Sequence, residues 1–381
     1  VQSICFLSGR WLVEKYDRGV RFFPRRQDMP ASAYIRAEDL FKERRTVLAL
    51  SYGWIQPGHP DRDCWHLSQV VVFLKHFLNT FPDSFDVALF WDFFSLEQLP
   101  RDATQNVRFK GALKFMNTLY GHIDVGILRL NSLPPGVHPT SMRGWPFFEE
   151  AIYSSASKPL TGEIYVCSDR SMLLSLGEPD KLDPSRSGVL LHSLKAARGV
   201  PLSPSYFHEQ LQDKRFTGKG DKEEVEKMYL HNFEISLKHC SLVDMTDMPW
   251  DASKARQLGS ALYHYPRVGI LKISGKDFDD ECLVELLKSG EFQQKSQLDS
   301  ELEICSTSIR RIDLLAELLR RTGRPSKLRL MSNHITCVQA LCQALAENAG
   351  PVSLDLSYNR LSDQSKQALR KAWADRGKLI L

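Results

Sequence analysis

Residues 46–54 read TVLALSYGW, a continuous apolar run that ends in polar and aromatic side chains. Runs of this kind are typical of strands buried on both faces of a parallel sheet. Three more follow, at 86–94 (DVALFWDFF), 124–130 (DVGILRL) and 162–168 (GEIYVCS). The first half of the chain therefore predicts four buried strands.

Segments with the helical spacing of apolar residues separate these strands, at 66–81, 106–123 and 146–155. Strands that alternate with helices predict an α/β fold, in which a parallel sheet carries helices on both faces. Ligands of such sheets gather at the carboxyl ends of the strands. The residues at these ends are Ser51, Tyr52, Trp54, Asp92 and Ser95.

Composition excludes several classes of protein. The 381 residues are enough for two or three folding units. With 50 Lys and Arg against 46 Asp and Glu, the net charge is only +4, which offers no field to steer nucleic acid or an anionic membrane. The apolar runs are shorter than the roughly 18 residues needed to span a bilayer. We therefore expect a soluble protein with no nucleic-acid or membrane partner.

The eight cysteines are scattered along the chain without a CxxC pair. Several stand inside apolar segments, where Cys acts as a small buried hydrophobe. They indicate reduced thiols, which favours the cytosol or nucleus over secretion, and we expect a cytoplasmic protein. The sequence begins at Val1 rather than Met, which leaves room for a leader or a further domain ahead of it.

A repeated frame, L-x-L followed by an apolar residue five positions later, occupies the last third of the chain. Its five copies begin 36, 31, 26 and 26 residues apart, and helical patterns lie between them. The copies are ISLKHCSL (235–242), LKISGKDF (271–278), LEICSTSI (302–309), LRLMSNHI (328–335) and LDLSYNRL (354–361). KLIL at 378–381 predicts a closing strand. Because one repeat cannot bury its apolar side alone, the pattern predicts parallel strands stacked in chain order.

This pattern resembles the ribonuclease-inhibitor class of leucine-rich repeat over residues 230–381. In that family one side chain of each repeat bonds the turn backbone, and Cys240, Asn333 and Asn359 occupy its position. Lys276 and Thr307 depart from the pattern there. The resemblance implies a short horseshoe that binds a protein partner or restrains the rest of its own chain. The alternative is a repeat that only covers an apolar flank of the first domain.

A region rich in Pro, Ser, Gly and charged residues connects the two halves, at 174–229. It predicts a helix at 192–199 (HSLKAARG) and another that Asp221 can cap ahead of an acidic first turn. GKGDK at 218–222 lacks the spacing and the preceding strand of a phosphate loop. The expected organisation is an α/β domain at 1–173, this connecting region, and leucine-rich repeats at 230–381.

Four blocks of the first half resemble the heterokaryon incompatibility (HET) domain, in that family's order. They are ALSYGW (49–54), WDFFSLEQ (91–98), MNTLY (116–120) and RGWPFFEE (143–150). The family reads approximately ALSYCWG, WIDSLCINQ, M-x-x-I-Y and RGWTLQE. The resemblance covers residues 45–155. It implies a flavodoxin-like parallel sheet similar to the Toll/interleukin-1 receptor (TIR) domain, and a function in cell death and self/non-self signalling.

The sequence departs from the HET pattern at Gly53, Ile55, Ser95 and Phe148. Phe148 replaces the glutamine that precedes the glutamate of the RGW block. Any hydrogen bond that the family makes with that glutamine is therefore lost here.

Glu149 is the position that the resemblance marks for catalysis. In TIR domains that cleave NAD, the catalytic glutamate follows a tryptophan by four residues, as Glu149 follows Trp145. Cleavage between nicotinamide and ribose develops positive charge on the sugar, which a fixed carboxylate stabilises. Near a helix N-terminus Glu149 is expected to be ionised, with Glu150 about 100° further round the helix. The alternative is a glutamate that serves only helix stability.

The other candidates would hold NAD as a substrate; we expect no tightly bound cofactor and no metal. Asp92 would orient a ribose hydroxyl, and Tyr52 and Trp54 would stack on a base. Arg143 would pair with the pyrophosphate, because its planar fork suits phosphate. Trp145 completes the set. Each has a structural alternative: Asp92 caps a turn, the tryptophans belong to the core, and Arg143 pairs with an acidic neighbour.

Other chemistry lacks a signature in this sequence. His59, Asp61, Cys64 and His66 share a loop but have no second pair at zinc spacing. GxSxG is absent, which argues against a serine hydrolase, and the cysteines have no His and Asn framework for a protease.

The order of the parts, effector first and repeat last, favours a signalling or cell-death effector of the innate-immunity type. The repeat would then recognise a partner or restrain the first domain. Whether that domain cleaves NAD stays open at this point. A non-catalytic interaction scaffold, whose first domain self-associates, is the alternative.

Overall fold

The computed structural model describes residues 3–42, 45–82, 85–122, 124–155, 163–180, 183–196, 199–216, 218, 220–246, 248–265, 268–288, 301–320, 325–347, 351–374 and 376–381. The chain divides into two compact units. The first unit comprises Val1–Tyr153, Pro159–Ala196 and Gln210–Tyr229, and the second comprises Ser154–Lys158, Ala197–Glu209 and Leu230–Leu381.

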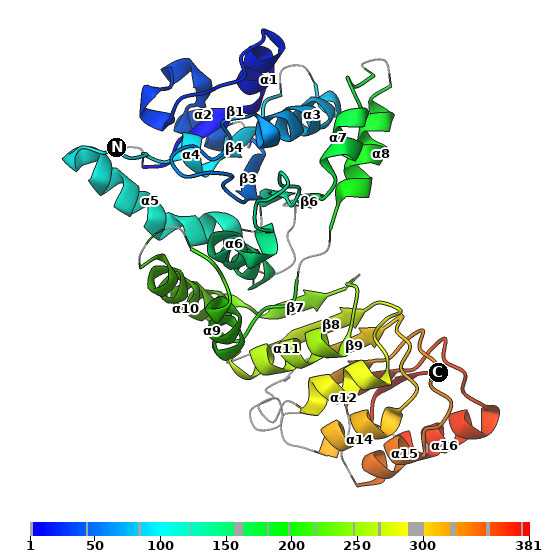
Figure 1. Ribbon diagram of the computed structural model, residues 1–381. Coiled ribbons are helices and arrows are strands. Elements are labelled where there is room, and N and C mark those ends of the chain that lie inside the picture. The colour runs from blue at the N-terminus through cyan, green and yellow to red at the C-terminus, as the bar shows by residue number, and fades with distance from the viewer. Residues whose placement is uncertain are drawn as a thin grey trace. The chain divides into compact units, whose positions relative to one another are not determined.

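The first unit is built on a six-stranded sheet in the order β2-β1-β4-β3-β5-β6 (Figure 1). The four predicted strands are present and parallel to one another: β3 (Val47–Tyr52), β4 (Ala88–Phe90), β5 (Val125–Leu130) and β6 (Ile164–Cys167). The α/β class is therefore confirmed.

The sheet is mixed rather than wholly parallel, which corrects the sequence-based expectation. β1 (Phe6–Ser8) runs antiparallel to β4 and to β2 (Tyr34–Ile35). Strands of three and two residues are too short to produce a readable apolar pattern.

Helices lie on both faces of this sheet, as Figure 1 shows for α1 and α3 on one side and α5 and α6 on the other. The three predicted helices are α3, α5 and α6. The α-helices in this part of the chain are α1 (Gly9–Asp17), α2 (Ala37–Lys42), α3 (Trp65–Asn79), α4 (Asp92–Ser95), α5 (Ala103–Gly121), α6 (Gly144–Ser155), α7 (Arg170–Ser175) and α8 (Pro184–Leu194). Three short 3-10 turns join them: η1 (Arg26–Asp28), η2 (Ala31–Ala33) and η3 (Thr140–Met142).

The order of the parallel strands positions the candidate site. Taken in chain order, β3, β4, β5 and β6 lie as second, first, third and fourth across the sheet. The chain moves from β3 to β4 on one side and then returns to β5 on the other side of β3. In such sheets ligands bind at the carboxyl ends of the strands beside the point where the connections change direction, which here lies between β3 and β5.

Part of the predicted connecting region folds onto the first sheet. Helix α8 ends at Leu194, so the helix predicted at 192–199 is wrong over its later part; residues 197 and 198 lie outside the described residues. The helix begins earlier because Pro184 suits its first turn and Asp183 caps it. Arg215 pairs with the start of α6, where its carbonyl accepts from the Gly144 N–H at 3.0 Å.

The second unit is built on an all-parallel sheet with its six strands in chain order. They are β7 (Leu242–Met245), β8 (Ile270–Ser274), β9 (Glu301–Cys305), β10 (Lys327–Arg329), β11 (Ser353–Asp355) and β12 (Lys378–Ile380). One described helix follows each of the first five: α11 (Ala252–Tyr263), α12 (Asp280–Lys288), α14 (Ile312–Arg320), α15 (Gln339–Ala346) and α16 (Asp363–Trp373). Figure 1 shows these helices in a row along one side of the strands. α9 (Pro204–Gln212) and α10 (Asp221–His239) precede β7.

The first of the five predicted repeats is misplaced. Residues 235–239 belong to helix α10, and Ile235 is 47% exposed, so ISL is not a buried strand. The strand lies at β7, where Val243 pairs with Leu271 in the next repeat. The strands of the other four copies and the closing strand are in place.

Two asparagines bond the turns between repeats, as expected. Asn333 is 3% exposed; its Nδ2 donates to the carbonyls of Ile304 and Leu330, at 2.7 and 2.9 Å. Asn359 donates to Leu330 and Leu356 at 2.8 and 2.9 Å. The Cys240 thiol contacts the carbonyl of Leu242, the first residue of β7, at 3.3 Å.

None of the helices in the described ranges has the length and apolarity that crossing a membrane requires.

Candidate functional site at the carboxyl ends of the first sheet

Asp92 accepts hydrogen bonds from two side chains at the end of β3 and just beyond it. It is the first residue of α4, directly beyond β4. Its Oδ1 accepts from the Tyr52 hydroxyl at 2.5 Å, and its Oδ2 accepts from Trp54 Nε1 at 2.9 Å. Burial raises the pKa of Asp92, although these donors and the Phe93 N–H oppose the shift. Three predicted site residues are thus brought together by bonds to one another.

The same bonds limit what these residues offer a ligand. Tyr52 is 5% exposed, and its ring packs edge-on against His66 and Trp91. Burial, then the Asp92 charge, raises the Tyr52 pKa well above its usual range, so the hydroxyl stays protonated. Trp54 is half-buried and packs edge-on against Phe93.

Glu149 lies deeper than the sequence predicted. It is the sixth residue of α6, beyond the first turn, and it is 7% exposed. Burial raises its pKa to about 8, and the Asp92 charge adds to the shift. The hydroxyls of Ser51 and Tyr120 and the charge of Arg129 oppose the shift without cancelling it. The expectation of an ionised carboxylate held by the helix dipole is therefore wrong at neutral pH in this state.

The Glu149 carboxyl has spare hydrogen-bonding capacity. Its Oε2 is buried and makes no hydrogen bond of good geometry, and the Ser51 hydroxyl of β3, which lies close enough to lower the Glu149 pKa, makes none either. The Tyr120 hydroxyl donates to the Leu50 carbonyl at 2.7 Å. A buried carboxyl with a displaced pKa and an unused oxygen is the kind of group that acid–base and charge-stabilising chemistry uses.

Glu150 faces elsewhere, as the helical rotation predicted. Its Oε2 lies 2.7 Å from Nη2 of Arg129, on β5. Nη1 of the same arginine donates to the Tyr153 hydroxyl at 3.1 Å. Glu150 is therefore a partner of Arg129, and only Glu149 of the two belongs to the buried cluster.

Arg143 lies against the loop that follows β3. A Cβ added at Gly53 would stand 2.9 Å from Arg143 Cδ and Nε, so the glycine allows this side chain to approach. Arg143 Nε donates to the His138 carbonyl at 3.2 Å. Burial lowers the Arg143 pKa. The Gly53 departure from the HET pattern thus has a local structural reason.

The Trp145 side chain donates a hydrogen bond to the connecting region. Its Nε1 donates to Asp221 Oδ2 at 3.1 Å, and its ring meets Phe148 edge-on. The Phe216 ring covers Gly144 so closely that a Cβ there would lie 1.9 Å from it. Phe148, where the family has glutamine, is wholly buried.

Two further candidates have structural positions. The buried Ser95 hydroxyl accepts from the Trp91 N–H at 3.0 Å. Asp61 caps α3 by accepting from the N–H groups of His66, at 2.9 Å, and Leu67, at 2.6 Å. Among the described residues no group of three or more His, Cys, Asp or Glu side chains could hold a metal ion.

Sequence reasoning missed three residues as site residues: Tyr120 and Arg129, which act on Glu149, and Asn131, which follows β5. Tyr120 stands in the MNTLY block, and Arg129 and Asn131 stand at the end of β5. Asn131 Oδ1 is buried without a hydrogen-bond partner. The residue follows β5, beside the point between β3 and β5 where the order of the strands reverses. The same attention to the end of β5 as to the ends of β3 and β4 would have found Arg129 and Asn131.

In comparisons with known proteins, no family model matches this chain and no curated protein matches it.

Proposed function

We propose that this chain is a signalling or cell-death effector in which a HET/TIR-like module is coupled to a leucine-rich-repeat module. One observation carries the proposal: the four blocks that resemble the HET domain contact one another. Tyr52 of the first block bonds Asp92 of the second. Tyr120 of the third bonds Leu50 of the first, and Arg143 of the fourth packs on Gly53. Motifs spread over about a hundred residues that meet in space are more specific than the same motifs in sequence alone.

The strand order supports the TIR-like part of the proposal. Flavodoxin-like sheets order their parallel strands 2-1-3-4-5 and bind ligands at the switch point beside the first strand. The four parallel strands here follow the first four places of that order. The buried cluster around Glu149 lies at the corresponding strand ends.

The second unit supports the recognition or restraint part of the proposal. Its strand–helix units recur every 26 to 31 residues from Val243 onward, and buried asparagines bond the turns. Buried apolar residues alternate with the partly or fully exposed charged residues Lys272, Glu303, Lys327 and Arg329 along the strands, whereas Glu301 at the start of β9 is buried. We assign to this charged face the binding of a protein partner, since stacked repeats present extended surfaces of this kind.

NAD cleavage is the second candidate function, and the buried position of Glu149 near Ser51, Tyr120 and Arg129 supports it. The reaction would break the bond between nicotinamide and ribose and add water to the sugar, releasing nicotinamide, ADP-ribose and a proton. Ionised Glu149 would stabilise the positive charge that develops on the ribose. Because its pKa is about 8, this activity would rise with pH through that value. The non-catalytic scaffold remains the alternative.

The test is nicotinamide release from NAD by the full chain at pH 7 and pH 9. Glu149→Gln is the variant, and Glu150→Gln is the matched control on the same helix. Release that rises with pH, disappears in Glu149→Gln and persists in Glu150→Gln supports an effector enzyme. If no release occurs, light scattering over a range of protein concentrations tests the scaffold. A chain that neither cleaves NAD nor self-associates would overturn the effector proposal.

A further inference from the structure

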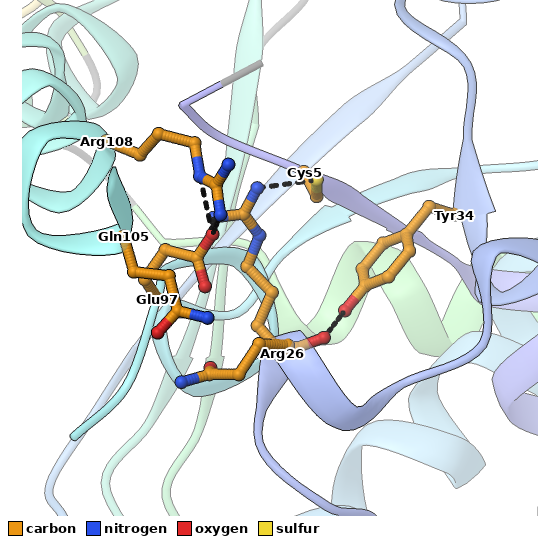
Figure 2. A pocket seen from close by; sticks show the side chains of 7 residues that line it. Cys5, Arg26, Tyr34, Glu97, Gln105 and Arg108 are labelled. Carbon is orange, nitrogen blue, oxygen red and sulfur yellow. Dashed lines mark hydrogen bonds and ion pairs between the residues drawn. The ribbon is translucent and has the colours of Figure 1, made fainter. Parts of the chain in front are cut away.

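The first unit contains a polar pocket of about 400 Å³ that is distinct from the cluster around Glu149. Figure 2 shows its side chains converging from the segment before β1, from η1, β2 and the loop after α4, and from α5. The lining residues are Cys5, Arg26, Gln27, Tyr34, Glu97, Gln105 and Arg108. A volume of this size is in the range of small-molecule sites.

Two guanidinium groups share one carboxylate in this pocket. Glu97 Oε1 lies 3.0 Å from Nη1 of Arg26, and 2.8 Å from both Nε and Nη2 of Arg108. All three contacts end on the same oxygen, while Oε2 is buried without a hydrogen-bond partner. The Glu97 side chain is 3% exposed, that of Arg26 9% and that of Arg108 27%.

The charges of the pocket do not balance. Among the described lining residues, two arginines stand against one acidic side chain, which leaves a net charge of +1. Nη2 of Arg26 lies 3.2 Å from the Cys5 sulfur. The Arg108 side chain is 27% exposed, so an anion that enters the pocket can reach a guanidinium that shares Glu97 with Arg26.

The walls of the pocket are already held in place. Gln27 exchanges two bonds with the Gln98 backbone, at 2.6 and 3.0 Å. The Tyr34 hydroxyl lies 2.9 Å from the Phe94 carbonyl, and burial raises its pKa, so it remains a donor. Gln105 accepts from the Asp102 N–H as part of the cap of α5. A site whose walls are fixed before binding loses little entropy when a ligand enters.

We propose that this pocket binds an oxyanion, the phosphate or carboxylate group of a small molecule, through Arg108 together with Arg26. Arg108 is the more exposed of the two, and its planar guanidinium can offer a further N–H to a ligand while two of its nitrogens stay on Glu97. Phosphate and carboxylate groups match the donor geometry of arginine. The bound anion would neutralise the surplus charge. The proposal does not depend on the effector function.

The probes are inorganic phosphate and acetate, titrated by calorimetry into the full chain at constant ionic strength. Arg108→Gln removes both the positive charge and the planar guanidinium, and Arg108→Lys keeps only the positive charge. Lys110→Gln is the matched control, because Lys110 is an exposed cation two residues further along α5. We expect wild type and Lys110→Gln to bind at least one probe, and Arg108→Gln to bind it about tenfold or more weakly. Stronger binding of phosphate than acetate would identify a phosphate ligand, and the reverse order a carboxylate.

Two results would overturn the proposal: no binding of either anion by wild type at millimolar concentration, or equal binding by wild type and Arg108→Gln. Circular dichroism checks that each variant is folded, and Glu97 keeps Arg26 as a partner when Arg108 is replaced. Should Arg108→Gln fail to fold, Arg108→Lys provides the same comparison, with weaker binding expected from the loss of the fork.

Discussion

The two sheets of this molecule each have six strands, but they use polar residues in opposite ways. In the first sheet β4 lies on one side of β3, and β5 and β6 lie on its other side, so the order in which the strands are added reverses after β4. Carboxyl groups lie buried at the ends of these strands. In the second sheet the strands follow in chain order, and charged residues alternate with buried ones along the strands. The connection order decides whether polar groups are desolvated in a crevice or solvated on a face.

The charged residues of the second sheet form a ladder of alternating sign. Asp244, Lys272, Glu303, Arg329 and Asp355 stand in register on adjacent strands. Arg329 Nη1 lies 2.8 Å from Glu303 Oε1, and Lys272 Nζ lies 3.5 Å from Glu303 Oε2. Pairs exposed to solvent gain little energy. The ladder therefore sets the electrostatic character of the face more than its stability.

The largest difference between the sheets should appear in the pH dependence of stability. Because burial raises the Glu149 pKa from 4.5 to about 8, the folded state favours the neutral acid. Its stabilising contribution is complete below pH 4.5 and is lost as the pH rises through 8, by at most about 5 kcal/mol. Urea denaturation at pH 5 and pH 8.5 measures this loss.

In Glu149→Gln much of that pH dependence should disappear, because the amide stays neutral. Asp92, whose pKa burial also raises, leaves a remaining slope of the same sign. Glu150→Gln is the control, because the neighbouring Glu150 side chain is 39% exposed and pairs with Arg129. Equal slopes for wild type and Glu149→Gln would contradict the buried acid.

In the second sheet the largest effect should come from Asn333, a buried side chain that bonds both neighbouring turns. Asn333→Ala removes two donated bonds and the Oδ1 that accepts from Thr307 N and Oγ1, at 3.0 and 2.6 Å. We expect a loss of about 3 kcal/mol in the free energy of unfolding. Asn106→Ala, at an exposed position on α5, should cost less than about 0.5 kcal/mol. Similar losses for the two variants would show that Asn333 does not support the repeats.

Asp92 tests whether the first sheet depends on its polar cluster. Asp92→Asn places an amide N–H against either the Trp54 indole N–H or the Phe93 backbone N–H, so one bond must break. The expected cost is about 2 kcal/mol. Trp54→Phe removes only the indole donor and should cost about 1 kcal/mol. If thermal unfolding of both variants matches that of wild type, Asp92 is not the organising residue of the strand ends.

The smallest effect should come from the ladder. The Arg329 side chain is 51% exposed, so Arg329→Ala should cost less than about 1 kcal/mol, and added salt should reduce that cost. Denaturation at low and high salt checks this. A larger, salt-independent loss would mean that the face is not solvated, and the contrast between the sheets would fail.

Continuous apolar runs predicted β3 to β6 because strands buried on both faces need them. They could not predict β1 and β2, which are too short for a pattern. The repeat frame was correct wherever its leucines are buried, as at Leu302, Leu328 and Leu354. It failed at Ile235, where the same letters continue a helix and the side chain is exposed.

The candidate site was predictable in position but not in state. Strand ends and ordered motifs selected Tyr52, Trp54, Asp92 and Glu149; the structure bonds Tyr52 and Trp54 to Asp92 and places Glu149 within the influence of the Asp92 charge. The sequence could not show that Tyr52 and Trp54 donate to Asp92 or that Trp145 donates to Asp221. Each of these bonds joins residues from 38 to 76 positions apart in the chain.

The sequence by itself determined the α/β class, the four parallel strands of the first half and four of the five repeats of the second. These follow from apolar patterns that act over a few neighbouring residues. Only the tertiary structure decided that Glu149 is a buried acid with a raised pKa and that Arg26 and Arg108 share Glu97. Desolvation and charge balance are sums over all neighbours in space, and those neighbours come from distant parts of the chain.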